Sequence, residues 1–349
     1  MITLLLVFLS CKKQDMATPA PALPGGNFST TASFNANLSS SEPFSNYEAE
    51  YKSMRAFGAR GAQTAAPWAS LNPSGTTYDL ATISNPYFGL SKLSEYGYET
   101  IFLNLPIITV STRSMPADIS SKSFDDPMVK ARFRALIDVI KDQINSKVKY
   151  IALGNEVDTY FSSHATEWAA YKNLVEDART YLKSIKPNIF VGVTTTFDGA
   201  TSKFPTQIKD LNTNMDAVML TYYPISSSFV PRDPGTVSGD IVKMIGIVPD
   251  KSVIMQEWGY PSSASLGSSE AKQAEFIYNS FVELEKQGAN KFPFVSFFKY
   301  RDWTSGYVQT LTGQNTGQPF FEFMSSLGLK NIDGSSKQAF TVVQGWIKP

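Results

Sequence analysis

Two patterns of hydrophobic and polar residues alternate along the chain from about Phe28 onward. Short apolar runs rich in β-forming residues are each followed by a segment whose apolar residues recur at helical spacing. The apolar runs predict strands at 28–35, 60–68, 100–107, 148–156, 189–195, 217–222, 252–257 and 294–300. This repetition is typical of successive βα units, whose strands run parallel.

The segments with apolar residues at helical spacing predict helices at 47–57, around 90–93, at 125–145, 166–185, near Ile208 and at 269–287. Asp126 followed by Pro127 is a typical helix start, and so is Ser269 followed by Glu270. Eight βα units favour an α/β fold, a (β/α)8 TIM barrel that forms a single catalytic domain over residues 28–349. A doubly wound open sheet is the alternative, but no Gly-rich phosphate-binding turn follows the first strand.

The first 27 residues differ from the rest in composition. An apolar run, 4–9, and a small residue stand directly before Cys11, the only cysteine, and this resembles the lipobox of bacterial lipoproteins. The resemblance implies a lipoprotein signal peptide over residues 1–11, lipidation of Cys11 and a membrane-anchored place in the bacterial cell envelope. Residues 12–27, rich in Pro, Ala and Gly, are predicted to be a flexible tether. The apolar run is too short for a transmembrane helix.

Charge and composition narrow the classes of ligand. The chain has 31 Lys and Arg and 31 Asp and Glu, without a long basic run, so we expect no nucleic-acid partner. A neutral ligand fits better, and the 13% of aromatic residues supply flat faces on which a pyranose can stack. His164 is the only histidine, which excludes metal sites built from several histidines. We expect neither a metal nor a cofactor.

Two acids end apolar strands of the predicted barrel. The run 148–156 is apolar until its last residues, Asn155 and Glu156, and the run 252–257 ends on Glu257. Because active sites of this fold lie at the C-terminal ends of the strands, both carboxyls should project at the barrel mouth. Such a pair suits glycoside hydrolysis, in which the leaving oxygen needs a proton and the anomeric carbon needs a nucleophile.

Asn-Glu at the end of strand four and Glu at the end of strand seven resemble the pattern of glycoside hydrolase clan A. The resemblance implies that Glu156 is the acid/base, that Glu257 is the nucleophile and that Asn155 holds the sugar 2-hydroxyl, with retention of configuration. The segments 154–156, 221–224 and 257–261 look most like those of endo-β-1,4-galactanases. Plant-type β-1,3-glucanases share Gly-Asn-Glu-Val and the turn Glu-x-Gly-x-Pro-Ser.

The same resemblance assigns further residues to the substrate site. Tyr222 or Tyr223 would donate a hydrogen bond to Glu257 and lower its pKa. Trp258 follows the nucleophile, and Trp303, just beyond strand eight, is expected as a floor beneath the reactive sugar. Trp68, in a motif after strand two, either stacks on sugar or wedges its loop.

One position departs from the clan pattern. Many clan members carry on strand two an Arg that supports the nucleophile, and Gln63 stands there in this chain. Gln63 is therefore expected at the substrate, and Arg60 or Arg301 is the candidate to take over the support.

The leading hypothesis is a retaining glycoside hydrolase that cleaves a β-linked polysaccharide or oligosaccharide, of β-galactan or β-glucan type, by double displacement as a monomer. A first rival is a non-catalytic glycan-binding lipoprotein on the same barrel, because a fold does not imply activity. A second rival is a purely structural envelope lipoprotein. It would leave Asn155, Glu156 and Glu257 without a reason to converge on one face.

Overall fold

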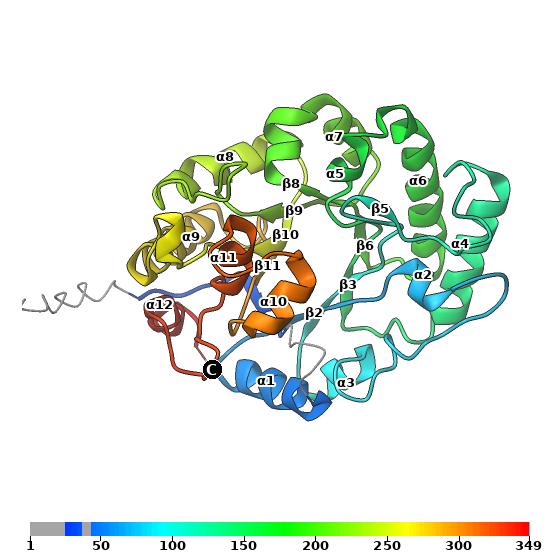
Figure 1. Cartoon of the computed structure of the whole chain (residues 1–349). Coiled ribbons are helices and arrows are strands. Elements are labelled where there is room, and N and C mark those ends of the chain that lie inside the picture. Colours follow the sequence, from blue (N-terminus) through cyan, green and yellow to red (C-terminus); the bar gives the residue numbers. More distant parts are fainter. Residues whose placement is uncertain (1–24, 37–42, 349) are drawn as a thin grey trace, which may run out of the picture.

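The computed structural model describes residues 25–36 and 43–348, which form a barrel of parallel strands surrounded by helices (Figure 1). The strands lie in the order β7-β6-β3-β2-β1-β11-β10-β9-β8. The first and last of these, β7 (Phe190–Gly192) and β8 (Thr194–Thr196), are consecutive pieces of one strand interrupted at Val193. The sheet therefore closes through this strand, and the predicted (β/α)8 TIM barrel is confirmed.

The other barrel strands fall within, or one residue beyond, the predicted apolar runs, and each pairs in parallel with its neighbours. They are β1 (Thr31–Phe34), β2 (Gly61–Ala65), β3 (Thr100–Asn104), β6 (Val148–Ala152), β9 (Val218–Tyr222), β10 (Val253–Trp258) and β11 (Phe294–Phe297). A short antiparallel pair follows β3 and consists of β4 (Ile108–Thr109) and β5 (Thr112–Arg113).

The helices cover the outside of the barrel. Those that the sequence predicts are α1 (Phe44–Ala56), α3 (Leu90–Glu95), α4 (Pro127–Ile140), α6 (Trp168–Ile185), α7 (Pro205–Asn212) and α9 (Glu270–Gln287). Both predicted starts are confirmed, because the Asp126 side chain accepts a hydrogen bond from the Met128 amide and the Ser269 side chain accepts one from Lys272.

Further helices have no counterpart in the prediction. They are α2 (Trp68–Leu71), α5 (Val157–Phe161), α8 (Thr236–Ile247), α10 (Ser305–Thr312), α11 (Pro319–Ser325) and α12 (Gln338–Trp346). Single turns at Ala165–Glu167, Gly199–Lys203 and Ala264–Leu266 complete the set.

Strand alternation sorts the side chains into an inner and an outer core. The inner core fills the barrel and consists of Phe102, Tyr150, Ala152, Ala217, Met219, Ile254 and Phe294. On β9 the intervening residues Val218 and Leu220 belong to the larger core that packs the strands against the helices. Because the inner core closes the barrel below, a ligand can meet only the residues at the C-terminal strand ends.

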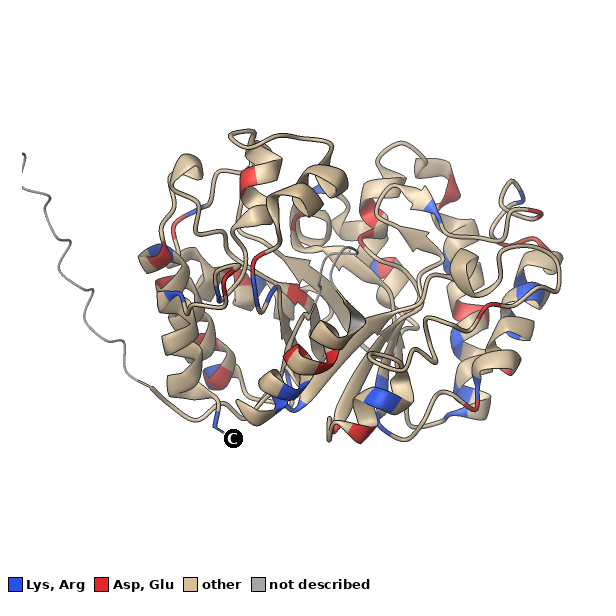
Figure 2. Ribbon diagram, turned by 60° about the horizontal axis from the view of Figure 1, so that its bottom comes forward, with Lys and Arg blue, Asp and Glu red and all other residues tan. Residues whose placement is uncertain are grey.

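A third hydrophobic cluster, here called the mouth cluster, lies where α10 and α11 fold over the end of β11 (Figure 1). Its buried members are Leu266, Phe298, Trp303, Val308, Phe321, Phe323 and Leu327. Acidic and basic residues are interspersed along the helices around the barrel (Figure 2). None of the helices in the described ranges is both long and apolar enough to cross a membrane.

Candidate active site

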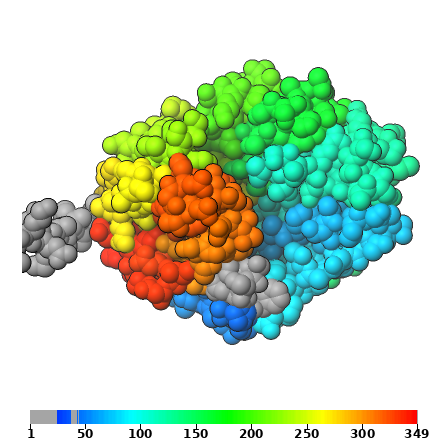
Figure 3. Space-filling view, viewed as in Figure 1, coloured from blue at the N-terminus to red at the C-terminus, as the bar shows by residue number. Residues whose placement is uncertain are grey.

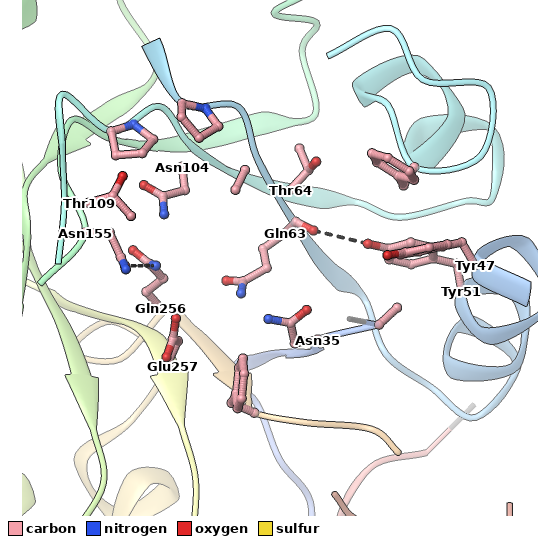
Figure 4. A pocket seen from close by; sticks show the side chains of 16 residues that line it. Asn35, Tyr47, Tyr51, Gln63, Thr64, Asn104, Thr109, Asn155, Gln256 and Glu257 are labelled. Carbon is pink, nitrogen blue, oxygen red and sulfur yellow. Dashed lines mark hydrogen bonds between the residues drawn. The ribbon is translucent and has the colours of Figure 1, made fainter. Parts of the chain in front are cut away.

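A pocket of about 330 Å³ opens at the C-terminal ends of the barrel strands. It is lined by Asn35, Ala36, Tyr47, Tyr51, Gln63, Thr64, Ala65, Pro67, Phe88, Asn104, Pro106, Thr109, Asn155, Gln256, Glu257 and Phe298. Figure 3 shows the surface hollowed at the centre of this face, beside the orange α10. Figure 4 shows side chains from the ends of several strands converging on the pocket. The pocket therefore lies where this fold places active sites.

Glu257 reaches the pocket because β10 is irregular near its end. The pairing of β10 with β9 shifts register between Met255 and Glu257, which is the sign of a β-bulge. The bulge lets two consecutive residues, Gln256 and Glu257, both line the pocket. The next side chain, Trp258, points to the helix layer and donates a hydrogen bond from Nε1 to the Ser280 hydroxyl at 3.0 Å.

Glu156 is aimed by a different local structure. It has a left-handed backbone, with φ 51° and ψ 44°, between the end of β6 and the start of α5. A Cβ at Gly154 would lie 2.4 Å from the Tyr171 hydroxyl and from the Val157 side chain, so only glycine fits before the Asn-Glu pair. The Thr221 hydroxyl donates a hydrogen bond of 2.6 Å to the Glu156 carboxyl. The strained turn thus fixes Glu156 over the end of β9.

Burial and neighbouring groups give the two carboxyls different proton affinities. Burial, together with the nearby Glu257 charge, raises the pKa of Glu156 to about 8. Burial also raises the pKa of Glu257, but hydrogen bonds from Tyr223 and Gln256 act in the opposite direction. The Tyr223 hydroxyl donates to Glu257 Oε2 at 2.6 Å. At neutral pH Glu156 therefore keeps its proton more readily than Glu257 does.

A buried acid, Asp158, holds the segment that follows Glu156 against β8. Asp158, only 3% exposed, accepts hydrogen bonds from the Thr196 amide at 2.8 Å and from the Thr196 hydroxyl at 2.7 Å. Its charge also contributes to the raised pKa of Glu156. The Asp158 carboxyl therefore links α5 to β8 and helps to keep Glu156 protonated.

The resemblance assigns Trp68, Tyr222 and Trp258 to the substrate site, but none of them lines the pocket, and of the two predicted roles of Trp68 the second, wedging its loop, is the one that the structure shows. Trp68 is fully buried and packs edge-on against Phe133 of α4, so it wedges the loop. Tyr222 and Trp258 are also fully buried and pack on each other in the helix layer. Tyr222 continues the outward alternation of Val218 and Leu220 on β9, and the bulge in β10 turns Trp258 outward. Of the two tyrosines, Tyr223 is the one that bonds Glu257.

Gln63, Asn155 and Glu257 are brought together in the pocket, and Glu156, which is not among the lining residues, lies close enough to Glu257 for the Glu257 charge to raise its pKa. Neither candidate Arg is near Glu257. Arg301 pairs with Glu50, and Arg60 precedes β2 at the end of the barrel opposite the mouth. In the described part of the chain, no ion pair involves Glu156 or Glu257. Tyr223 and Gln256 are the side chains that donate to Glu257 instead.

The aromatic ring that lines the pocket at the end of β11 belongs to Phe298. Trp303 is 5% exposed and packs edge-on against Phe298, with ring centroids 5.6 Å apart. It therefore lies one ring behind the pocket wall within the mouth cluster. A direct contact of Trp303 with sugar stays a prediction.

Several pocket residues were missed by the sequence reasoning. Asn35 and Asn104 end apolar runs as Asn155 does, so the rule that found Glu156 could have found them. Thr109 comes from the β4–β5 pair, for which the sequence gives no signal. Cys11 lies outside the described residues. Within the described residues, no group of three or more His, Cys, Asp or Glu side chains could hold a metal ion.

No family model matches the sequence, and no curated protein matches it. Solved structures do resemble the fold. An exo-beta-1,4-mannosidase, Op5Man5 from Opitutaceae bacterium strain TAV5, superimposes with a TM-score of 0.69 at 17% identity, covering 90% of this chain and 59% of that chain. The chain thus spans less than two thirds of that protein.

Two further structures are similar over most of this chain. GH5_18 from Streptomyces cattleya in complex with GlcNAc gives a TM-score of 0.69 at 15% identity, covering 91% of this chain and 80% of that chain. A family 39 glycoside hydrolase from Bacteroides cellulosilyticus WH2 gives 0.63 at 13% identity, covering 90% of this chain and 63% of that chain. At such low identity these likenesses establish the TIM-barrel fold.

Proposed function

We propose that this protein is a retaining glycoside hydrolase for β-linked glycans, with Glu156 as acid/base and Glu257 as nucleophile. The observation that carries the proposal is the meeting of two half-buried glutamates from the ends of β6 and β10 whose carboxyls have different hydrogen-bond partners. A purely structural protein has no use for two half-buried, mutually repelling acids beside an open pocket. The fold shared with glycoside hydrolases agrees with this function.

The reaction proceeds in two displacements. In the first, the Glu257 carboxylate forms a bond to the anomeric carbon while the glycosidic C–O bond breaks and the departing oxygen takes the Glu156 proton. In the second, Glu156 removes a proton from water, and the water oxygen displaces Glu257 from the same carbon. Two inversions restore the original configuration. The raised pKa of Glu156 suits the first step, and its return to the ionised form suits the second.

The pocket lining favours an uncharged, hydroxyl-rich sugar. Gln63 Oε1, Asn104 Oδ1 and Thr109 Oγ1 are buried without a hydrogen-bond partner in the described structure, and all three residues line the pocket. Buried acceptors need donors, which sugar hydroxyls supply. No Lys or Arg is among the described lining residues, so a uronic acid would leave its carboxylate unpaired.

The proposed substrate is therefore a neutral β-linked polysaccharide or oligosaccharide of β-galactan or β-glucan type. A β-mannoside belongs in the same test, because one structural neighbour is named as an exo-beta-1,4-mannosidase and another holds Manb1-4GlcNAc. The test is incubation with β-1,4-galactan, β-1,3-glucan, β-mannan, xylan and a β-glucuronide, with the products sized by chromatography. Cleavage of a neutral glycan but not of the glucuronide is expected. Tight binding without turnover would favour the non-catalytic glycan-binding alternative.

We further propose that the enzyme is anchored in the bacterial cell envelope by a lipid on Cys11. The support is the apolar run before this lone cysteine and the Pro-rich stretch after it. Replacing Cys11 with Ser removes the thiol that would carry the lipid, so the protein should move from the membrane fraction to the soluble fraction. Fractionation of cells that express each form measures this. Equal membrane association of both forms would contradict the anchor.

A further inference from the structure

A chain of hydrogen bonds at the pocket joins β8, β10 and the segment that follows β6. The Thr194 hydroxyl of β8 donates to Gln256 Oε1 of β10 at 2.5 Å. Gln256 Nε2 in turn donates to Asn155 Oδ1, beyond the end of β6, at 2.5 Å (Figure 4). Thr194 is fully buried and Gln256 is 2% exposed. Bonds this well buried hold their partners in one arrangement, because breaking either one leaves a buried polar group unpaired.

The neighbouring carboxylate fixes the direction of this chain. A hydrogen bond from Gln256 lowers the pKa of Glu257, so the Gln256 NH₂ group faces the Glu257 carboxylate, which as an anion can only accept. With its NH₂ on that side, the Gln256 oxygen faces the Thr194 hydroxyl, and Asn155 must offer its oxygen to Gln256. Asn155 is thereby left with its own NH₂ group as a donor to ligand in the pocket.

The bulge in β10 explains how one residue can serve both groups. In a regular strand, consecutive side chains point to opposite faces, and Gln256 and Glu257 could not both enter the pocket. The register shift at this point turns them to the same side. Gln256 is therefore held next to the nucleophile by the backbone and next to Asn155 by its own amide.

We propose that Gln256, oriented by Thr194, is a positioning residue that sets the NH₂ group of Asn155 toward the sugar 2-hydroxyl and supports the ionised form of Glu257. The inference rests on the proposed function. Gln256 then supplies part of the support for the nucleophile that an Arg on strand two supplies in the clan pattern. Gln63, which stands at that place, has its amide oxygen unpartnered, and no described hydrogen bond joins it to Glu257.

The chain offers a matched pair of threonines for the test. Thr194 and Thr195 are adjacent in β8 and both fully buried, but the Thr195 hydroxyl has no hydrogen-bond partner in the described structure. T194V removes the hydroxyl that orients Gln256, whereas T195V removes one that bonds nothing. Both changes keep the shape of the side chain, so a loss caused by packing would be common to the two variants. T194S restores the hydroxyl and should restore the wild-type behaviour.

The kinetic readout compares an aryl β-glycoside with its 2-deoxy counterpart. T194V should lower kcat/KM for the 2-hydroxy substrate about tenfold more than for the 2-deoxy substrate, because one hydrogen bond of roughly 1–1.5 kcal/mol depends on the oriented amide. T195V should match the wild type on both substrates. Equal losses on both substrates, or equal losses in T194V and T195V, would overturn the proposed orientation of Asn155.

A second readout does not require turnover. Carboxyl groups of ¹³C-labelled glutamates are titrated by NMR in the wild type, T194V, T195V and Q256M. The Glu257 pKa should rise in Q256M and T194V, since the donor is lost or turned away, and should stay unchanged in T195V. An unchanged Glu257 pKa in Q256M would refute the support of Glu257 by Gln256. If the wild type cleaves no glycoside, the proposed function fails, while this titration still decides the positioning role.

Discussion

The ends of β6 and β10 present the same kind of side chain in different surroundings. Glu257 accepts hydrogen bonds from Tyr223 and Gln256, and these stabilise its ionised form against burial. Glu156 accepts one from Thr221 and lies near the charges of Glu257 and Asp158, which favour its protonated form. Their neighbours, rather than the residue type, therefore divide the roles between acid and nucleophile.

The two strand ends also break the regular strand in different ways. Glu156 turns through a left-handed backbone at one residue, and Glu257 is re-aimed by a bulge. Both devices free a side chain from the alternation that would otherwise decide its direction. Small local irregularities at two strand ends are thus what brings the carboxyls to one pocket.

Removing the nucleophile should cause the largest loss of activity. E257Q keeps the volume and the hydrogen bond from Tyr223 but cannot bond the anomeric carbon, so kcat should fall on the order of 10⁴-fold or more. Glycan affinity, measured by calorimetry, and the melting temperature should change little. Substantial activity in E257Q would show that another group is the nucleophile.

Removing the acid should give a loss that depends on the leaving group. E156A should slow hydrolysis of natural glycans by about 10²–10⁴-fold, the usual contribution of general acid catalysis. An activated aryl glycoside needs no proton on departure, so the glycosyl-enzyme should form and accumulate for want of a base. Azide needs no base and should restore turnover, giving a β-glycosyl azide from a β-linked substrate. Its configuration is read by NMR, and an α-azide would mean that the mechanism is not retaining.

Two adjacent tyrosines at the end of β9 allow a finer test of this difference. Tyr223 donates to Glu257, while Tyr222 donates to Asp240 of α8 at 2.9 Å. Y223F should lower kcat/KM about tenfold to a hundredfold, since a hydrogen bond to a charged group contributes roughly 1.5–3 kcal/mol. It should also raise the pKa of Glu257, so the acidic limb of the pH profile should move to higher pH.

Y222F is the matched control, because it also removes a tyrosine hydroxyl bound to a buried carboxylate. It should lower the melting temperature without moving the pH profile. A pH profile that shifts equally in Y222F and Y223F would mean that the bond from Tyr223 to Glu257 does not tune the nucleophile.

The barrel and its acids follow from the sequence because they depend on periodicity over long segments. The strand that precedes Glu156 and the strand that contains Glu257 are apolar runs of ordinary length, and their C-terminal ends must meet at one face of a closed barrel. The helix α8 was missed because its apolar residues, with two glycines among them, give a weak helical pattern. The helices α10 and α11 follow the last strand, beyond the repeat that guided the prediction.

The directions of single side chains could not be obtained in the same way. The choice between Tyr222 and Tyr223 depends on which face of β9 is inward. The prediction that Trp258 contacts substrate failed because the bulge in β10 turns its side chain away from the pocket. Trp68 sits in a loop whose path no periodicity specifies. The bond from Gln256 to Asn155 joins residues 101 positions apart and leaves no pattern in the sequence.

The last expected effect concerns stability rather than rate, and it tests whether Glu156 is the acid that burial keeps protonated. Its pKa is raised from 4.5 to about 8 in the folded protein. Between these values the unfolded chain releases the proton and the folded chain retains it, so the free energy of unfolding falls as the pH rises through this window. E156Q cannot titrate and lacks this loss. The melting temperature of E156Q minus that of the wild type should therefore grow from about pH 4.5 to about pH 8 and then level off. Calorimetry across this range measures it, and a difference that stays constant with pH would show that Glu156 is ionised in the resting enzyme.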